Sequence, residues 1–177
     1  MCDHVPMRTV STSGATEAQL RRAVIADAAA VQELTCKAYA KWVPVIGREP
    51  MPMRADHVAA LREHLVDLLY VEDQLAALVE MIPAADYLLI ENVAVLPALQ
   101  GRGLGRRLMA HAEALAVSLR LREMPLYTNK EFTSNLELYR RLGYRVDCEE
   151  LFMGGTTVHI SKPVGQSPQM SAMGEPA

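Results

Sequence analysis

The chain has 177 residues, of which 50% are hydrophobic, 22% are charged and only 5% are aromatic. This composition excludes a disordered chain and predicts one globular domain with a largely aliphatic core. The 18 basic and 21 acidic residues give a formal net charge of −3. A protein that binds nucleic acid through phosphate contacts is normally basic, so that class is disfavoured.

The three cysteines are far apart in the chain, at Cys2, Cys36 and Cys148. Their spacing predicts neither a disulfide framework nor a zinc site, and we expect no metal. No apolar run approaches the ~20 residues that a membrane helix requires. The N-terminus also lacks the basic and apolar regions of a secretion signal. We therefore expect a reduced, cytoplasmic protein with no membrane partner.

Small and polar residues dominate both ends of the chain, at 1–18 and 164–177. We expect flexible tails there and a single domain over residues 19–163, because no repeat or linker divides the middle. In chain order, a short strand is predicted at Leu20–Ala23, followed by a helix with Asp27 as its N-cap. Its apolar face is expected to carry Val31, Leu34, Ala38 and Trp42.

Prolines and a glycine predict a loop over residues 43–53, and a second helix follows with apolar residues at helical spacing, at Val58, Leu61, Leu65 and Leu68. Two apolar runs, Ala76–Ile82 and Tyr87–Val95, are predicted to form antiparallel strands. A long helix comes next, with its apolar face at Leu104, Leu108, Ala112, Leu115 and Leu119.

A short strand over 125–129 precedes a helix whose start is predicted as a capping box of Ser134 and Glu137. Gly143 is expected to end that helix in a left-handed conformation. Two further strands are predicted within residues 144–162, turning at Gly154 and Gly155. This order of elements predicts a mixed α and β domain.

The most informative segment is a turn with three alternate glycines, Gly101, Gly103 and Gly105, which follows a strand and opens a helix. Glycines let the backbone approach a ligand closely, and the free N–H groups and dipole of a helix start favour an anion. A phosphate ligand is the natural interpretation. The alternative is a tight turn at a helix start that binds nothing.

Two other phosphate-binding loops do not fit this turn. A Walker A loop requires Lys followed by Ser or Thr after the last glycine, and no such pair follows Gly105. The dinucleotide fingerprint places its third glycine one residue later and needs an acidic residue at the end of the next strand. That strand ends here at Tyr127-Thr128-Asn129, so a nicotinamide-dependent oxidoreductase would lack its ribose ligand.

The motif Gln100-x-x-Gly103-x-Gly105, after a strand that ends in Val95-Leu96-Pro97, resembles the acyl-CoA pyrophosphate loop of the GNAT superfamily of N-acetyltransferases. Residues 135–144 (NLELYRRLGY) resemble the second CoA-contacting helix of the same superfamily, and residues 46–53 (IGREPMPM) resemble a bacterial subgroup of unassigned substrate. The resemblance covers roughly residues 20–162. It implies an α+β fold (α/β/α layers), with a mostly antiparallel central sheet, a splayed strand pair and helices on both faces.

The activity implied by the resemblance is transfer of an acetyl group from acetyl-CoA to a primary amine of a small molecule or peptide by direct attack. The chain would then be an acyl-CoA-dependent N-acyltransferase. The alternative is a GNAT-like domain that binds acyl-CoA as a sensor and transfers nothing. Acetyl-CoA is the expected cosubstrate, no metal or nucleic acid is implied, and a homodimer is left open.

The resemblance assigns CoA contacts to three segments. The strand is expected to pair with the pantetheine arm, the N–H groups of the turn are expected to hold the pyrophosphate, and the later helix adds further contacts. The CoA-binding candidates are Val93, Ala94, Val95, Gln100, Gly101, Arg102, Gly103, Leu104, Gly105, Arg106, Asn135 and Tyr139. Arg102 and Arg106 also add positive charge beside an anionic ligand. Asn135 could equally be a helix N-terminal residue with no ligand.

Acetyl transfer to an amine requires a neutral nucleophile and a proton for the leaving thiolate. The conjugate thiol has a pKa near 8.5 and an alkyl amine a pKa near 10, so a phenol can serve as the acid and a base must deprotonate the amine. Tyr139 occupies the position of the acid in the family motif, four residues before Gly143. The alternative is a core tyrosine packed beside Leu138 and Leu142.

Glu91 interrupts an apolar strand, where an unpaired carboxylate is costly. Strict alternation places its side chain on the face shared with Val93 and Val95. Some GNAT enzymes carry a carboxylate base on this strand, so Glu91 is a candidate general base that acts through a water. A cation-binding carboxylate and a structural hydrogen-bonded carboxylate are the alternatives, and Glu80 on the neighbouring strand is the second candidate.

The resemblance implies an acceptor pocket formed largely by the first two helices and their loop. The candidate residues are Tyr39, Trp42, Arg48 and Glu80. The aromatic pair would suit a cationic amine, although such residues also occur on packed helix faces. The remaining groups of interest have no partner at a catalytic spacing and are interpreted as structural or surface residues: His64, His111, His159 and Cys148.

Overall fold

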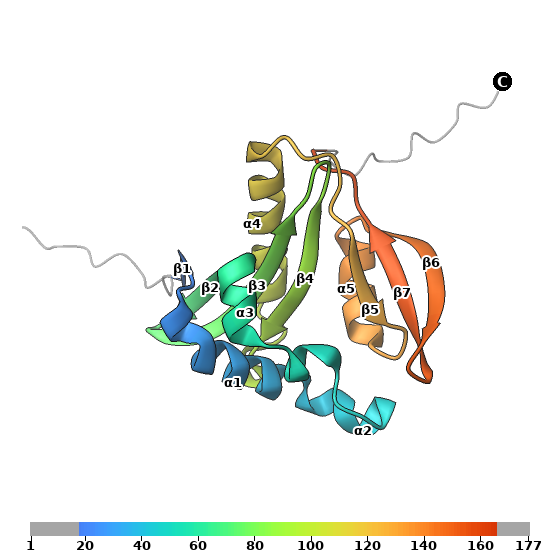
Figure 1. The fold of residues 1–177 in the computed structure, drawn as a ribbon, viewed down its shortest axis with the longest axis horizontal. Coiled ribbons are helices and arrows are strands. Elements are labelled where there is room, and N and C mark those ends of the chain that lie inside the picture. The colour runs from blue at the N-terminus through green and yellow to red at the C-terminus, as the bar shows by residue number, and fades with distance from the viewer. Residues whose placement is uncertain (1–17, 166–177) are drawn as a thin grey trace, which may run out of the picture.

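The computed structural model describes residues 18–165, which form one seven-stranded sheet with helices on both faces (Figure 1). The strands lie in the order β1-β2-β3-β4-β5-β7-β6, and all neighbours are antiparallel except β4 and β5. Their bounds are β1 Ala18–Arg22, β2 Leu65–Val71, β3 Gln74–Pro83, β4 Leu88–Val95, β5 Leu126–Asn129, β6 Arg145–Phe152 and β7 Gly155–Ser161. The predicted α+β fold is therefore confirmed.

Alternation along the strands divides the core into two layers. On β3, Leu78 packs against α1 (Ala28–Tyr39), whereas Ala77 and Val79 face the opposite layer, beneath α4 (Leu104–Ser118). The helix α5 (Thr133–Arg141) joins the layer of α4. The short helices α2 (Val43–Ile46) and α3 (His57–Glu63) follow α1 in the chain. Because apolar side chains leave the sheet on both sides, helices cover both faces.

The second predicted helix is shorter than its spacing suggests, because Leu65 and Leu68 belong to strand β2. The helix α3 ends at Glu63, and His64 is already extended. Residues 66–69 are almost completely buried, so β2 is covered on both faces, and its apolar residues, interrupted only by Asp67, show no strand alternation. A segment that is buried on both faces cannot be distinguished from a buried helix by the period of its apolar residues alone.

The helix starts also differ from the sequence prediction. Asp27 occupies the N-cap position of α1 as predicted, but its carboxylate makes no capping bond and instead accepts from the backbone N–H of Val24 and pairs with Arg21. The helix α5 begins at Thr133 with Phe132 as its N-cap, so the predicted capping box of Ser134 is wrong. Within residues 43–53, predicted as a loop, lie α2 and the start of a 3₁₀ turn. Gly143 adopts the predicted left-handed conformation, with φ of 92°.

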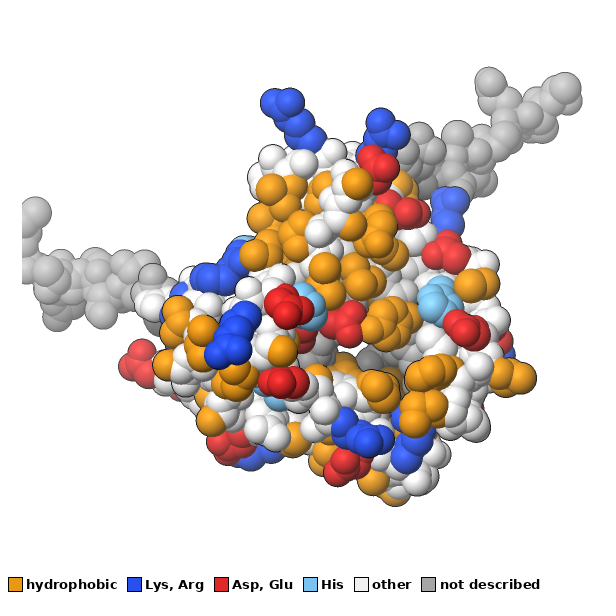
Figure 2. Space-filling model, viewed as in Figure 1, with side chains coloured by type: hydrophobic (Ala, Val, Ile, Leu, Met, Phe, Trp, Pro, Cys, Tyr) orange, Lys and Arg blue, Asp and Glu red, His pale blue; other side chains and the backbone are white. Residues whose placement is uncertain are grey.

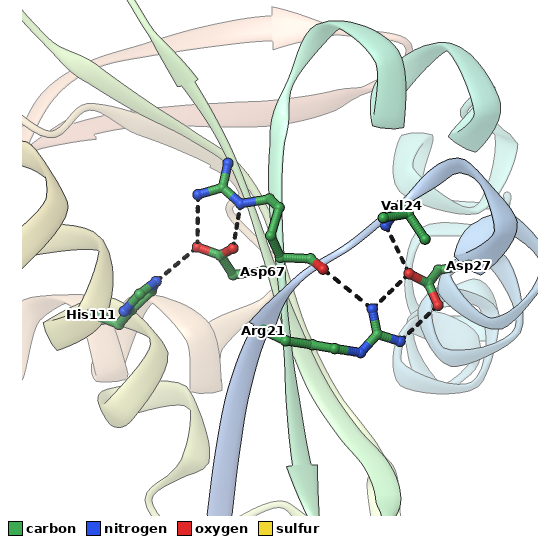
Figure 3. A network of polar contacts seen from close by, with 6 residues as sticks. Arg21, Val24, Asp27, Asp67 and His111 are labelled. Carbon is green, nitrogen blue, oxygen red and sulfur yellow. Dashed lines mark hydrogen bonds and ion pairs between the residues drawn. The ribbon is translucent and has the colours of Figure 1, made fainter.

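Two ion-pair groups connect β1 to its surroundings (Figure 3). The Arg21 guanidinium bonds both carboxylate oxygens of Asp27 at 2.8 Å and holds the pKa of that carboxyl below its usual range. Asp67 on β2 is 4% exposed and accepts from Arg22 Nε at 2.6 Å. The other oxygen of Asp67 lies 2.7 Å from His111 Nε2 on α4. The contacts of Asp67 attach the edge strand β1 and the helix α4 to β2, and the Arg21–Asp27 pair attaches β1 to the start of α1.

None of the helices within residues 18–165 is long and apolar enough to cross a membrane.

Candidate functional site

The strands β4 and β5 diverge after one point of contact. Their register contains the single pair Ile90 and Leu126, and beyond it the two strands separate (Figure 1). A cavity of about 500 Å³ lies at this separation and is lined from both sides of the sheet. Figure 2 shows the hollow near the middle of one face, with acidic and hydrophobic side chains around it. The diverging strands are the predicted splayed pair.

A β-bulge in β4 sets the direction of the candidate base. On β3, Glu80 pairs with Asn92 and the next residue, Met81, pairs with Ile90, so Glu91 is an extra residue in β4. Before the bulge, Ile90 packs in the α4 layer, and after it Val93 and Val95 do so. The prediction that Glu91 shares a face with Val93 and Val95 is therefore wrong. The bulge directs Glu91 and Asn92 to the α1 side.

Three carboxylates line the cavity, Glu80, Glu91 and Glu150, and the first two have different partners. Glu80 is 5% exposed, and its Oε1 lies 2.6 Å from Nδ1 of His64. Glu91 is half-buried and accepts a hydrogen bond of 2.6 Å from the hydroxyl of Tyr127. Glu80 and Glu91 come from adjacent strands on the same face, so the cavity wall between them is acidic.

Asn92 is buried between these two carboxylates along the sheet. Its Oδ1 accepts from the Tyr39 hydroxyl at 3.0 Å, whereas its Nδ2 has no partner among the described residues. His57 also lines the cavity, is 4% exposed, and has both ring nitrogens unpartnered within residues 18–165. Buried polar atoms without partners cost free energy, so both side chains retain unused hydrogen-bonding capacity beside the cavity.

Burial keeps the phenols of this site protonated. It raises the pKa of Tyr139 to about 12, and the Tyr139 hydroxyl makes no hydrogen bond to the described part of the chain. Burial raises the pKa of Tyr39 further, with Tyr139, Glu80 and Glu91 adding to the effect. Burial, and then the hydrogen bond to Glu91, raise the pKa of Tyr127. Tyr139 is thus a neutral donor without a partner in the cavity wall.

The glycine turn lies at the carboxyl end of β4, outside the cavity wall. Gly101 and Gly103 have φ of 79° and 80°, and Gly103 is the residue that precedes α4. The first helical bond is donated by Arg107 to the Gly103 carbonyl, so the preceding N–H groups of the helix start are free of helical partners. Gln100 donates to the Val95 carbonyl at 3.0 Å, which fixes the turn to the strand.

Most of the other predicted site residues line the cavity, namely Tyr39, Arg48, Glu80, Glu91, Val93, Asn135 and Tyr139. Ala94 is buried under α1 instead. Trp42 does not line the cavity, but its ring stacks on Phe132, which does, at a centroid distance of 4.5 Å. Arg102 and Arg106 are exposed in and just after the turn.

Sequence reasoning missed the histidine pairs, and the statement that three histidines lack partners is wrong. His64 pairs with Glu80, His111 with Asp67, and His159 with Glu150 at 3.2 Å. These partners are 16, 44 and 9 residues apart in the chain, so they meet only through strand pairing or, for His111, through the packing of α4 on the sheet. Tyr127 and Asn92 were missed as site residues for the same reason. Among the described residues, no group of three His, Cys, Asp or Glu side chains could hold a metal ion.

Known protein families and solved structures share this fold. Residues 62–146 match the family model described as an acetyltransferase (GNAT) domain. The PaiA N-acetyltransferase of Thermoplasma acidophilum, solved in complex with coenzyme A, is 14% identical with a TM-score of 0.73, over 83% of this chain and 99% of that one. No curated protein sequence matches the chain significantly.

Two further solved structures share the fold but differ in the acceptors that their names give. The ribosomal-protein-S18-alanine N-acetyltransferase of Escherichia coli is 16% identical with a TM-score of 0.70, over 89% of this chain and 100% of that one. Nourseothricin acetyltransferase is 19% identical with a TM-score of 0.66, over 83% and 98%. The fold is thus that of the GNAT acetyltransferases. Within this fold, residues 62–146 carry the match to the GNAT acetyltransferase domain.

A substitution at Gly103 tests whether the glycine turn binds CoA. The substitution Gly103→Ala puts a Cβ on a residue with φ of 80°, where no atom lies within 4 Å, so its cost is backbone strain of about 1 kcal/mol. If the turn holds the CoA pyrophosphate, its N–H groups shift and CoA should bind roughly 10-fold more weakly, which corresponds to ~1.4 kcal/mol.

Calorimetric titration with CoA measures this effect. Gly154→Ala is the matched control, because Gly154 has φ of 76° and open space around it but lies in the β6–β7 hairpin. It should lower the melting temperature by a similar amount and leave CoA binding unchanged. Equal CoA affinity in both variants would remove the turn from the binding site.

Proposed function

We propose that this protein is an N-acetyltransferase that moves an acetyl group from acetyl-CoA to a primary amine of a small molecule or peptide by direct attack. The observation that carries the proposal is the cavity at the β4–β5 separation, which is lined by two carboxylates, Glu80 and Glu91, and by the phenol of Tyr139, which has no hydrogen-bond partner within residues 18–165. A neutral donor and proton acceptors around one space are the groups that amide formation requires.

In this proposal, acetyl-CoA lies along the open edge of β4. The backbone groups of Val93 and Val95 face the gap to β5, where no ladder partner is present among the described strands, whereas those of Ala94 between them face β3. The pantetheine amides would pair there, much as a further strand does. The pyrophosphate would lie on the N–H groups of residues 100–105, with Arg102 and Arg106 adding positive charge and Asn135 contributing from α5.

The acceptor would enter on the α1 side of the sheet. Tyr39 and Arg48 line this part of the cavity, and Trp42 supports Phe132 behind it. The acidic wall of Glu80 and Glu91 attracts an ammonium group, and Glu91 would take its proton through a water, leaving a neutral nucleophile. No metal-dependent step is needed for this chemistry.

Collapse of the tetrahedral intermediate expels the CoA thiolate, which requires a proton. Tyr139 supplies it in this proposal, because its hydroxyl has no partner among the described residues and its pKa of about 12 keeps it protonated. The second proton of the amine nitrogen then restores the phenol. The balance is one ammonium and one thioester consumed, and one amide, one thiol and one free proton formed.

The test is release of free thiol from acetyl-CoA in the presence of spermidine, tyramine, kanamycin and an alanyl tripeptide, with the amide product identified by mass spectrometry. Transfer to at least one of these amines supports the proposal. Tight binding of acetyl-CoA with no transfer to any of them would instead indicate a domain that senses acyl-CoA.

A further inference from the structure

The two carboxylates that β3 and β4 contribute to the cavity, Glu80 and Glu91, differ in the group to which each can pass a proton. Glu91 contacts the hydroxyl of Tyr127, a phenol whose pKa is raised by burial and by that same hydrogen bond. Such a phenol stays protonated and cannot accept a further proton from Glu91. Glu80 contacts an imidazole instead, which is the side chain best suited to accept and release protons near neutral pH.

The His64–Glu80 pair also connects the inside of the cavity to its outside. Glu80 is 5% exposed and lines the cavity, whereas the His64 side chain is 24% exposed and is not part of the cavity wall. His64 immediately follows α3, at the start of β2, and its Nδ1 faces Glu80 Oε1 at 2.6 Å. The imidazole therefore bridges a buried carboxylate and the solvent.

Acetylation of an ammonium group leaves one proton that must reach the solvent in each turnover. Once the donor and acceptor occupy the cavity, they displace most of the water through which this proton could diffuse directly. A base that keeps the proton cannot serve in the next cycle. The site therefore requires an exit for the proton, and Tyr127 cannot provide one for Glu91.

We propose that the His64–Glu80 pair is this proton exit. The inference rests on the proposed acetyl transfer. The proton taken from the acceptor ammonium passes from Glu91 through cavity water to the Glu80 carboxylate, and then to the ring nitrogen of His64 that faces Glu80. The other ring nitrogen releases a proton to solvent, so that both carboxylates return to their ionised form. His64 touches no substrate and acts as a positioning and relay residue.

Two substitutions separate proton relay from a structural tether between α3 and β3. His64→Gln retains a side chain that can hydrogen-bond Glu80 but cannot carry a proton, and His64→Ala removes the side chain. With the best amine of the panel, both variants should lose about 10-fold in kcat. This is less than the loss of a direct acid or base, because residual cavity water still carries some protons. The KM for acetyl-CoA should not change.

Rescue by a free proton carrier gives the decisive readout. Rising concentrations of imidazole in a phosphate buffer should restore kcat of His64→Ala toward the wild-type value. His111→Ala is the matched control, because His111 faces a buried carboxylate, Asp67, at 2.7 Å but lies away from the cavity. Its kcat should be close to that of the wild type and independent of imidazole. Thermal melting verifies that each variant is folded.

Wild-type kcat in His64→Gln, or a loss in His64→Ala that imidazole does not restore, would overturn the relay while leaving acetyl transfer intact. Absence of transfer by the wild-type protein itself, with acetyl-CoA bound, would overturn the proposed function and the relay together.

Discussion

Replacement of Tyr139 by Phe should lower kcat about 100- to 1,000-fold while the affinity for CoA stays within a factor of two or so. The variant loses one hydroxyl and keeps a ring that packs at 5.6 Å from the ring of Tyr144. Because the hydroxyl makes no hydrogen bond to the described residues, its removal leaves no donor or acceptor of the protein unsatisfied. The effect should therefore appear in the chemical step, measured as thiol release at saturating substrates.

Tyr144→Phe is the control for this variant. Tyr144 is buried beside Tyr139, burial raises the pKa of its phenol as well, and its hydroxyl has no partner in the described residues, yet it does not line the cavity. Its kcat should equal that of the wild type. The raised pKa of Tyr139 also predicts that kcat does not fall as the pH rises through 10, the ordinary value for a phenol. An unchanged kcat in Tyr139→Phe would mean that another group protonates the thiolate.

Replacement of Glu91 by Gln should lower kcat about 100-fold, with little change in the KM for acetyl-CoA. The amide has the shape of the carboxylate but cannot take a proton, and it can still accept the hydrogen bond from Tyr127. The loss should be largest at low pH, where most of the acceptor is charged and needs deprotonation. Rates measured across pH with the same amine test this expectation.

The Glu91 variant also separates the roles that the sequence leaves open. A higher KM for the amine at constant kcat would identify Glu91 as a carboxylate that binds the cation, and a lower melting temperature alone would identify a structural carboxylate. Glu149→Gln is the control, because Glu149 belongs to an exposed ion pair with Lys130 on the far edge of the sheet. It should leave kcat unchanged.

Local signals predicted most of the fold. Three parts of the fold show their residue pattern within one continuous segment: the hairpin of β3 and β4, the long helix after the glycines, and the final hairpin. The strand β2 was missed because its residues 66–69 are buried on both faces, which removes the alternation that marks a strand. The start of α5 was misplaced because Ser134 has a capping sequence but does not occupy the capping position.

Only some residues of the candidate site could be predicted from the sequence, namely those that a local motif or pattern marks. The turn at residues 100–105 and Tyr139 are marked by motif spacing, and Glu91 by its charge in an apolar strand. The partners of these groups come from tertiary contacts that the sequence does not specify: Tyr127 on β5 lies 36 residues from Glu91, and Tyr39 on α1 lies 53 residues from Asn92. The acceptor pocket is less predictable still, because it combines side chains from most elements of the domain.

The bulge at Glu91 reverses, between the two halves of β4, which residues face α4 and which face α1. In the first half, even-numbered residues such as Leu88 and Ile90 lie beneath α4, whereas in the second half the even-numbered Ala94 lies beneath α1. Deletion of Glu91 would therefore leave both halves in their present layers, because Asn92 would then follow Ile90 in regular alternation and Val93 and Val95 would stay on the α4 side. It would remove the bulge together with the carboxylate. The inserted residue thus adds a carboxylate to the α1 side of the strand without moving the apolar residues of either half out of their layers.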